Sequence, residues 1–166
     1  MFMRIREKNR VVILVSVMCL MAGCSGTGEK KTMECSISIS CETLLDNMDS
    51  LKEEKHKYVP KDGILLEKKL METEEGSSVF DLLQKACREE NIHMEYSDSP
   101  VYHASYIEGI GQIYELDCGS LSGWMYSVNG DFPNYGCSKY ELQPGDEVEF
   151  VYTCDLGEDV KGKMEK

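Results

Sequence analysis

The sequence predicts an α+β domain in which one helix packs on a face of a mixed β-sheet. Segments with strand-like alternation come both before and after a single strongly amphipathic segment. Their order is not the strict strand–helix–strand alternation of a doubly wound parallel sheet. About 125 residues lie between two polar ends, which is enough for one domain with its own core.

The predicted strands are defined by alternation and by turn residues. Residues 35–41 alternate serine with isoleucine between two cysteines, which predicts the first strand. The turn signal Pro60-Lys-Asp-Gly63 precedes a second strand over residues 64–73, and the polar stretch 45–57 is expected to hold one helical turn. Later strands are predicted at 92–96, 112–117, 123–128 and 147–154.

The helix is predicted from its start signal and its apolar stripe. Ser78 and Asp81 have the spacing of a capping box, so the helix should run from there to about Glu90. Cys87 falls on the apolar side, as expected for a free thiol in the core. We expect the stripe to cover one face of the sheet, with the first and last strands adjacent. The stripe consists of Val79, Leu82, Leu83 and Ala86.

The N-terminus carries an export signal. A basic leader precedes the apolar run 11–22, which is shorter than the roughly 20 residues needed to span a bilayer. Residues 1–23 are therefore predicted to be a signal peptide. Leu20-Met-Ala-Gly-Cys24 resembles a bacterial lipobox, which implies that Cys24 is lipidated and anchors an extracytoplasmic protein to the bacterial cell membrane. An ordinary cleaved signal peptide is the alternative.

The flanking segments and the charge complete the domain plan. Residues 24–32 are predicted to be a flexible tether and residues 158–166 a disordered charged tail. The formal net charge of −12 argues against nucleic-acid binding, which requires a basic surface. It also argues that the lipid, and not the protein surface, holds the domain to an anionic membrane.

The cysteines favour an oxidising compartment. Apart from Cys19 and Cys24, six remain, and an even number in an exported chain predicts disulfide bonds of undetermined connectivity. There is no Cys-x-x-Cys motif, so neither a zinc ribbon nor a thioredoxin-like site is predicted. The six are Cys35, Cys41, Cys87, Cys118, Cys137 and Cys154.

The stretch Ser122-Gly-Trp-Met-Tyr-Ser-Val-Asn-Gly130 holds the only tryptophan. Trp124, Tyr126 and Val128 alternate with other residues, and Asn129-Gly130 is typical of a type I′ hairpin turn. Two interpretations stay open. Trp124 is either an exposed platform on which a flat ligand stacks, or an aromatic side chain that fills the core of a small sheet.

Catalytic motifs are absent from the sequence. Gly119-Ser-Leu-Ser-Gly123 places leucine where a nucleophile elbow needs serine, and the three histidines are scattered. No set of nucleophile, base and oxyanion donors can be assembled. We therefore expect a protein that is not an enzyme and that has no metal site and no required cofactor.

Several motifs follow one another along the domain: Glu75-Gly-Ser-Ser-Val-Phe-Asp-Leu-Leu83, Tyr106-Ile-Glu-Gly-Ile110, Asp117-Cys-Gly-Ser-Leu-Ser-Gly-Trp124, Tyr126-Ser-Val-Asn-Gly130, Tyr135-Gly-Cys137, Pro144-Gly-Asp146 and Tyr152-Thr-Cys-Asp-Leu-Gly157. Together they resemble the motifs of the transcobalamin-like C-terminal domain found in bacterial surface lipoproteins. This resemblance covers residues 33–157 and implies a β-grasp sheet whose first and last strands are parallel at its centre.

The resemblance also implies a function. In cobalamin carriers a domain of this type closes over one face of a corrinoid, and a helical domain supplies the other half of the cage. A partner protein or a second copy is expected to complete the cage here. The alternative is a structural or adhesive interaction module of the cell envelope without a small-molecule ligand. The implied ligand-binding residues are Trp124, Met125, Tyr126 and Tyr106, and the implied disulfide pairs are Cys41–Cys154 and Cys118–Cys137.

Overall fold

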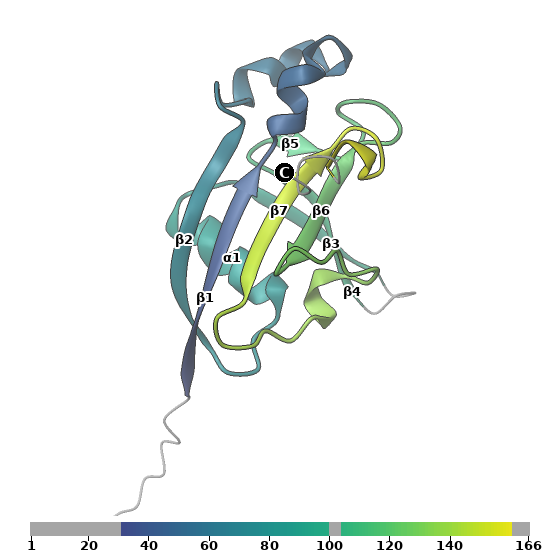
Figure 1. Ribbon diagram of the computed structural model, residues 1–166. Helices are drawn as coiled ribbons and strands as arrows, with labels where there is room; N and C mark the ends of the chain where they lie inside the picture. Colours follow the sequence, from purple (N-terminus) through teal and green to yellow (C-terminus); the bar gives the residue numbers. More distant parts are fainter. Residues whose placement is uncertain (1–30, 100–103, 161–166) are drawn as a thin grey trace, which may run out of the picture.

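A four-stranded mixed sheet forms the centre of the fold (Figure 1). The computed structural model describes residues 31–99 and 104–160. The strand order is β2-β1-β7-β6, and β1 and β7 are parallel, whereas the outer pairs are antiparallel. This confirms the predicted neighbouring first and last strands. The strands are β1 (Thr32–Ser40), β2 (Ile64–Glu74), β6 (Gly123–Val128) and β7 (Glu147–Thr153).

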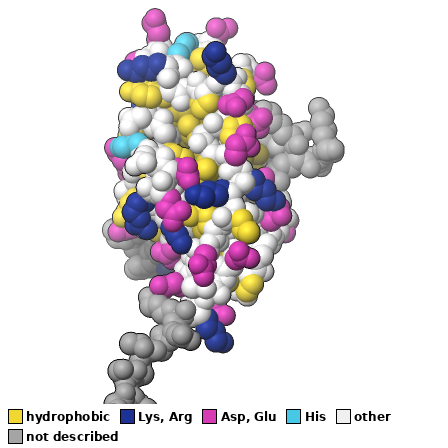
Figure 2. All heavy atoms as spheres, turned by 90° about the vertical axis from the view of Figure 1, so that its left-hand side faces the viewer, with side chains coloured by type: hydrophobic (Ala, Val, Ile, Leu, Met, Phe, Trp, Pro, Cys, Tyr) yellow, Lys and Arg dark blue, Asp and Glu magenta, His cyan; other side chains and the backbone are white. Residues whose placement is uncertain are grey.

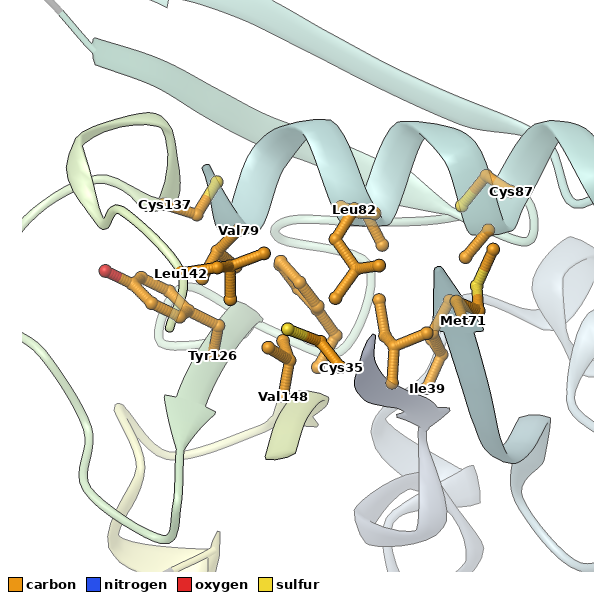
Figure 3. Packing of buried hydrophobic residues seen from close by; sticks show 14 of the residues in the cluster. Cys35, Ile39, Met71, Val79, Leu82, Cys87, Tyr126, Cys137, Leu142 and Val148 are labelled. Atoms are coloured by element: carbon orange, nitrogen blue, oxygen red, sulfur yellow. The ribbon is translucent and has the colours of Figure 1, made fainter. Parts of the chain in front are cut away.

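Helix α1 (Val79–Glu89) lies across one face of this sheet (Figure 1). Its capping box is formed as predicted: Asp81 N–H donates to Ser78 Oγ at 3.2 Å, and Ser78 N–H donates to Asp81 Oδ2 at 2.8 Å. The predicted stripe is buried against side chains of the sheet, as Leu82 above Ile39 illustrates (Figure 3). The α+β class follows directly from this packing.

A second, three-stranded sheet was not predicted. It consists of β3 (Met94–Ser99), β4 (Ala104–Ile110) and β5 (Ile113–Tyr114), in that order. Strand β4 lacks a clean alternation of apolar residues, which hid it from the sequence. Of the strand predicted at 112–117, only β5 pairs, because the chain turns through positive φ values of 62° at Leu116 and 102° at Gly119.

Three short 3-10 helices follow β1, where the sequence predicted one helical turn. They are η1 (Glu42–Asp46), η2 (Met48–Ser50) and η3 (Glu53–Tyr58). They lie over one end of the central sheet (Figure 1) and enclose a second hydrophobic cluster. The buried members of this cluster are Cys41, Leu44, Leu51, Ile113, Cys118 and Tyr152.

The fold extends beyond both predicted domain boundaries. Strand β1 already begins at Thr32, inside the predicted tether. At the other end, residues 158–160 are helical and Val160 is only 4% exposed. The Asp159 carboxylate holds this turn by accepting hydrogen bonds from the Thr153 hydroxyl and from Cys154 N–H, the latter at 2.8 Å. The signal peptide, Cys24 and residues 161–166 lie outside the described residues.

All six cysteines of the described residues are free thiols. The implied Cys118–Cys137 pair is not brought together, because Cys137 packs in the main core while Cys118 belongs to the second cluster. Cys41 is a buried member of the second cluster and Cys154 packs against that cluster, but the two are not bonded. Cys87 is buried near the end of α1 (Figure 3), and burial raises the pKa of its thiol to about 12, as fits a core thiol.

The surface is charged but mixed in sign. The side of the molecule that carries β2 presents acidic and basic side chains among apolar ones (Figure 2). Exposed ion pairs such as Lys68–Glu147, at 2.7 Å, contribute little stability in water. None of the helices in residues 31–99 and 104–160 is long and apolar enough to cross a membrane.

Candidate ligand-binding site

A cleft of about 440 Å³ runs along the free edge of β6. Its walls come from β4, from the loop 133–137 and from β6 itself, and its floor includes Phe150 of β7. All four residues proposed from the sequence as ligand contacts line it: Trp124, Met125, Tyr126 and Tyr106. Residues separated by up to 20 positions in the chain therefore meet in one concavity.

The turn after β6 has the predicted geometry. Asn129 and Gly130 have positive φ values of 53° and 87°, and Val128 and Asp131 exchange both backbone hydrogen bonds, at 2.9 and 3.0 Å. The predicted hairpin stops after this one pair, because the strand that pairs with β6 is β7. The chain beyond Asp131 is thus released to form the opposite wall of the cleft.

The backbone of β6 also faces the cleft. Asn129 N–H bonds to Glu147 O of β7, whereas Val128 bonds to Asp131 on the outer side. Because the bonding direction alternates along an antiparallel strand, the backbone N–H and C=O groups of Trp124 and Tyr126 point away from β7. The edge strand therefore presents donors and acceptors beside its aromatic side chains.

Trp124 both fills the core and lines the cleft, which are the two roles that the sequence left open. Its ring is partly buried, packs edge-on against Tyr152 with 5.3 Å between ring centroids, and contacts both hydrophobic clusters. Its indole N–H donates to Ile113 O at 2.9 Å. The ring nevertheless lines the cleft. It is a core side chain with one surface left open.

Tyr126 forms part of the buried floor of the cleft. It is 9% exposed and stacks on Phe150, with 5.9 Å between ring centroids. Its hydroxyl donates to Tyr135 O at 2.9 Å, which holds the loop 133–137 against β6. Burial is the largest cause of a raised pKa for this phenol.

Tyr106 is the exposed member of the set. It is 47% exposed on β4, and its hydroxyl is hydrogen-bonded to the Glu115 carboxylate. Partial burial and this hydrogen bond raise the pKa of the phenol to about 12, so that it stays a neutral donor at physiological pH. Of the four side chains, that of Tyr106 is the most exposed to solvent.

Met125 packs partly outside the cleft. It lies between Trp124 and Tyr126 on β6, so its side chain projects toward the opposite face of the strand. A Cβ added at Gly157 would lie 2.8 Å from the Met125 sulfur, which shows that the thioether packs against that glycine. Met125 is nevertheless among the residues that line the cleft.

Two further side chains of the cleft were missed by the sequence analysis. Tyr135, 49% exposed, stacks on Tyr140 with rings 13° from parallel. Lys139 is the one charged residue among the described residues of the lining. In the sequence, Tyr135-Gly-Cys137 is recognisable only as one motif of the family resemblance. No local pattern predicts that it forms a wall of the cleft opposite β6.

Gly136 fixes the width of the cleft. A Cβ at this position would come within 2.7 Å of the Ala104 Cβ on β4. Ser105 N–H of the same strand donates to Ser138 Oγ at 2.9 Å. The loop 133–137 and β4 are therefore in direct contact, and only glycine permits that approach.

A buried carboxylate supports the segment that leads into β6. Asp117 is 3% exposed, and its side chain contacts Lys52 at 2.9 Å and Lys55 at 3.2 Å and accepts Tyr114 N–H at 2.8 Å. Burial opposes ionisation, but these donors outweigh it and lower the pKa of Asp117 below its ordinary value. The 3-10 helices are thereby tied to the chain just before β6.

One protein family and several solved structures are similar to this chain. A family described as a domain of unknown function, DUF4430, matches residues 76–153. No curated protein matches the chain.

Among solved structures, haptocorrin in complex with Cbi (cobinamide) is similar, with a TM-score of 0.54 and 13% identity. The match covers 76% of this chain but only 26% of haptocorrin, and it shows a shared fold. A Ruminococcus gnavus ATCC 29149 protein, to which metal binding is provisionally ascribed, aligns with a TM-score of 0.40 and 12% identity, over 73% of this chain and 96% of its own.

Proposed function

We propose that this protein is a lipid-anchored, extracytoplasmic binding protein, not an enzyme, and that its β6 cleft captures a flat, amide-bearing ligand of the corrinoid class. One observation carries the proposal. Four residues selected as ligand contacts from sequence motifs line a single cleft at the free edge of the sheet. The shared fold with part of haptocorrin, a protein solved with cobinamide, supports the choice of ligand class.

The chemistry of the cleft suits such a ligand. The open faces of Trp124, Tyr106 and Tyr135 offer apolar area for a planar macrocycle. The outward backbone groups of β6 and the neutral Tyr106 hydroxyl can pair with the amide side chains at the rim of a corrin ring. Polar groups that fix orientation within an aromatic cleft are typical of small-molecule sites.

The cleft covers only one face of such a ligand. It is open, and the alignment with haptocorrin spans 26% of that chain. A ligand held on one side buries less surface, so the cost of association is offset only in part. We expect a dissociation constant for the chain alone in the micromolar range or weaker, at about 1 μM or above. A partner protein or a second copy would cover the other face.

Membrane attachment completes the proposal. The lipidated residue is Cys24, and residues 25–31 connect it to β1. More than one acyl chain at that position, at about 0.8 kcal/mol for each buried methylene, holds a protein at a bilayer durably. The acidic surface would keep the domain away from anionic lipid headgroups.

The test is a titration of the full-length chain in detergent with cyanocobalamin. Trp124 is the only tryptophan, so quenching of its emission reports on the cleft directly. A free tryptophan derivative, titrated in parallel, corrects for light absorbed by the ligand. The proposal predicts saturable quenching with calorimetric heat at the same midpoint. Quenching identical to that of the free derivative, with no heat, would exclude corrinoid capture and favour an interaction module of the envelope.

A further inference from the structure

Two thiols from distant parts of the chain meet at the end of the sheet beside the 3-10 helices. Cys118 follows β5, and Cys154 follows β7. Both belong to the second hydrophobic cluster, Cys118 as a member 5% exposed and Cys154 as a partly exposed neighbour. Gly123 pairs with Thr153 in the β6–β7 ladder, so Ser122, whose hydroxyl accepts Cys118 N–H, lies beside Cys154. The Cys118 thiol itself donates to Asn47 O at 3.7 Å.

The backbone around both cysteines is fixed by further bonds. Cys118 N–H donates to Ser122 Oγ at 3.1 Å, and the Tyr152 hydroxyl donates to the same oxygen at 3.0 Å. Leu156 N–H bonds to Leu121 O at 3.0 Å, which joins the loop after β7 to the loop before β6. The two thiol-bearing loops are therefore held side by side whether or not the sulfurs are linked.

From this juxtaposition we propose that Cys118 and Cys154 form a disulfide bond, in place of the Cys41–Cys154 and Cys118–Cys137 pairs that the family resemblance implies. Cys41 shares the cluster, but it follows Ser40, which pairs with Val151 of β7, three residues before Cys154. Cys137 lies in the other cluster, beside the start of α1 (Figure 3).

The remaining cysteines are occupied elsewhere in the core. The Cys35 thiol donates to Gln143 O at 3.3 Å, and Cys87 lies near the end of α1, away from Cys137 (Figure 3). Among the described cysteines, Cys118 and Cys154 are the two whose loops are joined directly, through the Leu156 N–H bond to Leu121 O. A single disulfide and four buried thiols is the expected oxidised state.

The bond forms by exchange with an external disulfide, either a small-molecule disulfide or that of an oxidoreductase. The thiolate of Cys154, the more accessible of the two, attacks one sulfur and expels the first external thiolate, leaving a mixed disulfide. Cys118 then gives up its proton and attacks the Cys154 sulfur, expelling the second. Two protein thiols are oxidised and one external disulfide is reduced to two thiols.

The disulfide bond would constrain the segment that leads into β6 and the candidate site. Cys118 begins the turn that ends at Ser122, and two residues later the chain reaches Trp124. Linking this turn to the end of β7 fixes the strand on which the cleft is built, and it restricts the unfolded chain between the two cysteines. The inference does not rest on the identity of the ligand.

The test maps disulfides in the full-length chain. The folded protein is reduced, incubated with oxidised glutathione, quenched with acid, alkylated and digested for mass spectrometry. The expected result is one linked peptide pair, Cys118 with Cys154, in the wild type and equally in Cys41→Ser. Cys154→Ser, which alters a partly exposed side chain, should lack the linkage and serves as the matched control.

A second readout is thermal stability. The oxidised wild type should melt about 10 °C above its reduced form, and this difference should vanish in Cys154→Ser. A linkage of Cys154 to Cys41, or recovery of both Cys118 and Cys154 as alkylated thiols after oxidation, would overturn the proposal.

Discussion

The indole N–H of Trp124 donates a hydrogen bond to the backbone carbonyl of Ile113, with 2.9 Å between Nε1 and the oxygen. This bond joins the edge strand of the central sheet to β5 of the second sheet, and Trp124 itself lines the candidate cleft. The residue proposed as the main ligand contact is therefore also part of the structure that holds the two sheets together.

Substitutions at Trp124 should lower both stability and affinity, by separable amounts. Trp124→Ala removes a large, partly buried ring and should cost about 3 kcal/mol of unfolding free energy, whereas Trp124→Phe loses mainly the hydrogen bond to Ile113, about 1 kcal/mol. Denaturant unfolding measures these costs. Calorimetry should show weaker cyanocobalamin binding for the folded Phe variant, and unchanged affinity would exclude the indole as a contact.

Tyr106→Ala should weaken binding without unfolding the domain. The ring is 47% exposed and forms a wall of the cleft, so its loss should lower corrinoid affinity about tenfold and change stability by less than about 1 kcal/mol. Tyr58→Ala, at a 36% exposed tyrosine on η3 outside the cleft lining, is the matched control. Equal affinity in both variants would place the ligand elsewhere.

Lys139 should distinguish ligands that carry a phosphodiester. It is the one charged residue among the described residues of the cleft lining, in a protein of net charge −12. Cyanocobalamin has a nucleotide phosphodiester and cobinamide lacks it, so Lys139→Glu should weaken binding of the first more than of the second. The difference should shrink at high salt. Equal losses for both ligands would contradict a phosphate contact.

Asp117 should make stability depend on acid. Because its folded pKa lies below the ordinary value of 3.8, its contribution is present above about pH 4 and is lost as the pH falls through the lowered folded value. Asp117→Asn should cost about 2 kcal/mol at pH 7 and flatten the pH dependence of unfolding below pH 4. Denaturant midpoints between pH 2.5 and 7, chosen to span about one unit below and three above the ordinary value, test this. If the pH dependence of unfolding below pH 4 is the same in the variant as in the wild type, Asp117 is not its source.

Gly136→Ala should disturb the cleft by overpacking. The new methyl group would lie 2.7 Å from the Ala104 Cβ, which should cost about 1–3 kcal/mol and push the loop 133–137 from β4. Adding Ala104→Gly removes the opposing methyl group and should restore binding. If the double variant binds no better than the single one, this contact does not set the shape of the cleft.

The parts of the fold that followed from the sequence are those with local signals. The capping box at Ser78, the positive-φ turn at Asn129-Gly130 and the alternation in β1 each depend on residues close together in the chain. The same holds for the α1 stripe. The adjacency of β1 and β7 was predicted from the simplest packing of the elements, their parallel arrangement at the centre came from the family resemblance, and both are confirmed.

The parts that did not follow depend on tertiary contacts. Strand β4 is specified by its pairing with β3 and by the close approach of Gly109 to the Tyr114 ring, not by a pattern of its own. The cleft wall at Tyr135 depends on the Tyr126 hydroxyl reaching its carbonyl. The proximity of Cys118 and Cys154 likewise required coordinates, because it depends on β6–β7 pairing and on the Leu156 N–H bond to Leu121 O.

The most direct test of the account is a crystal structure of the protein soaked with cobinamide. The account predicts planar density in the β6 cleft, with the corrin ring against Trp124 and Tyr106 and its amide groups within hydrogen-bonding distance of the β6 backbone. Density for the ligand on another face, or an empty cleft in crystals soaked well above the solution dissociation constant, would contradict it.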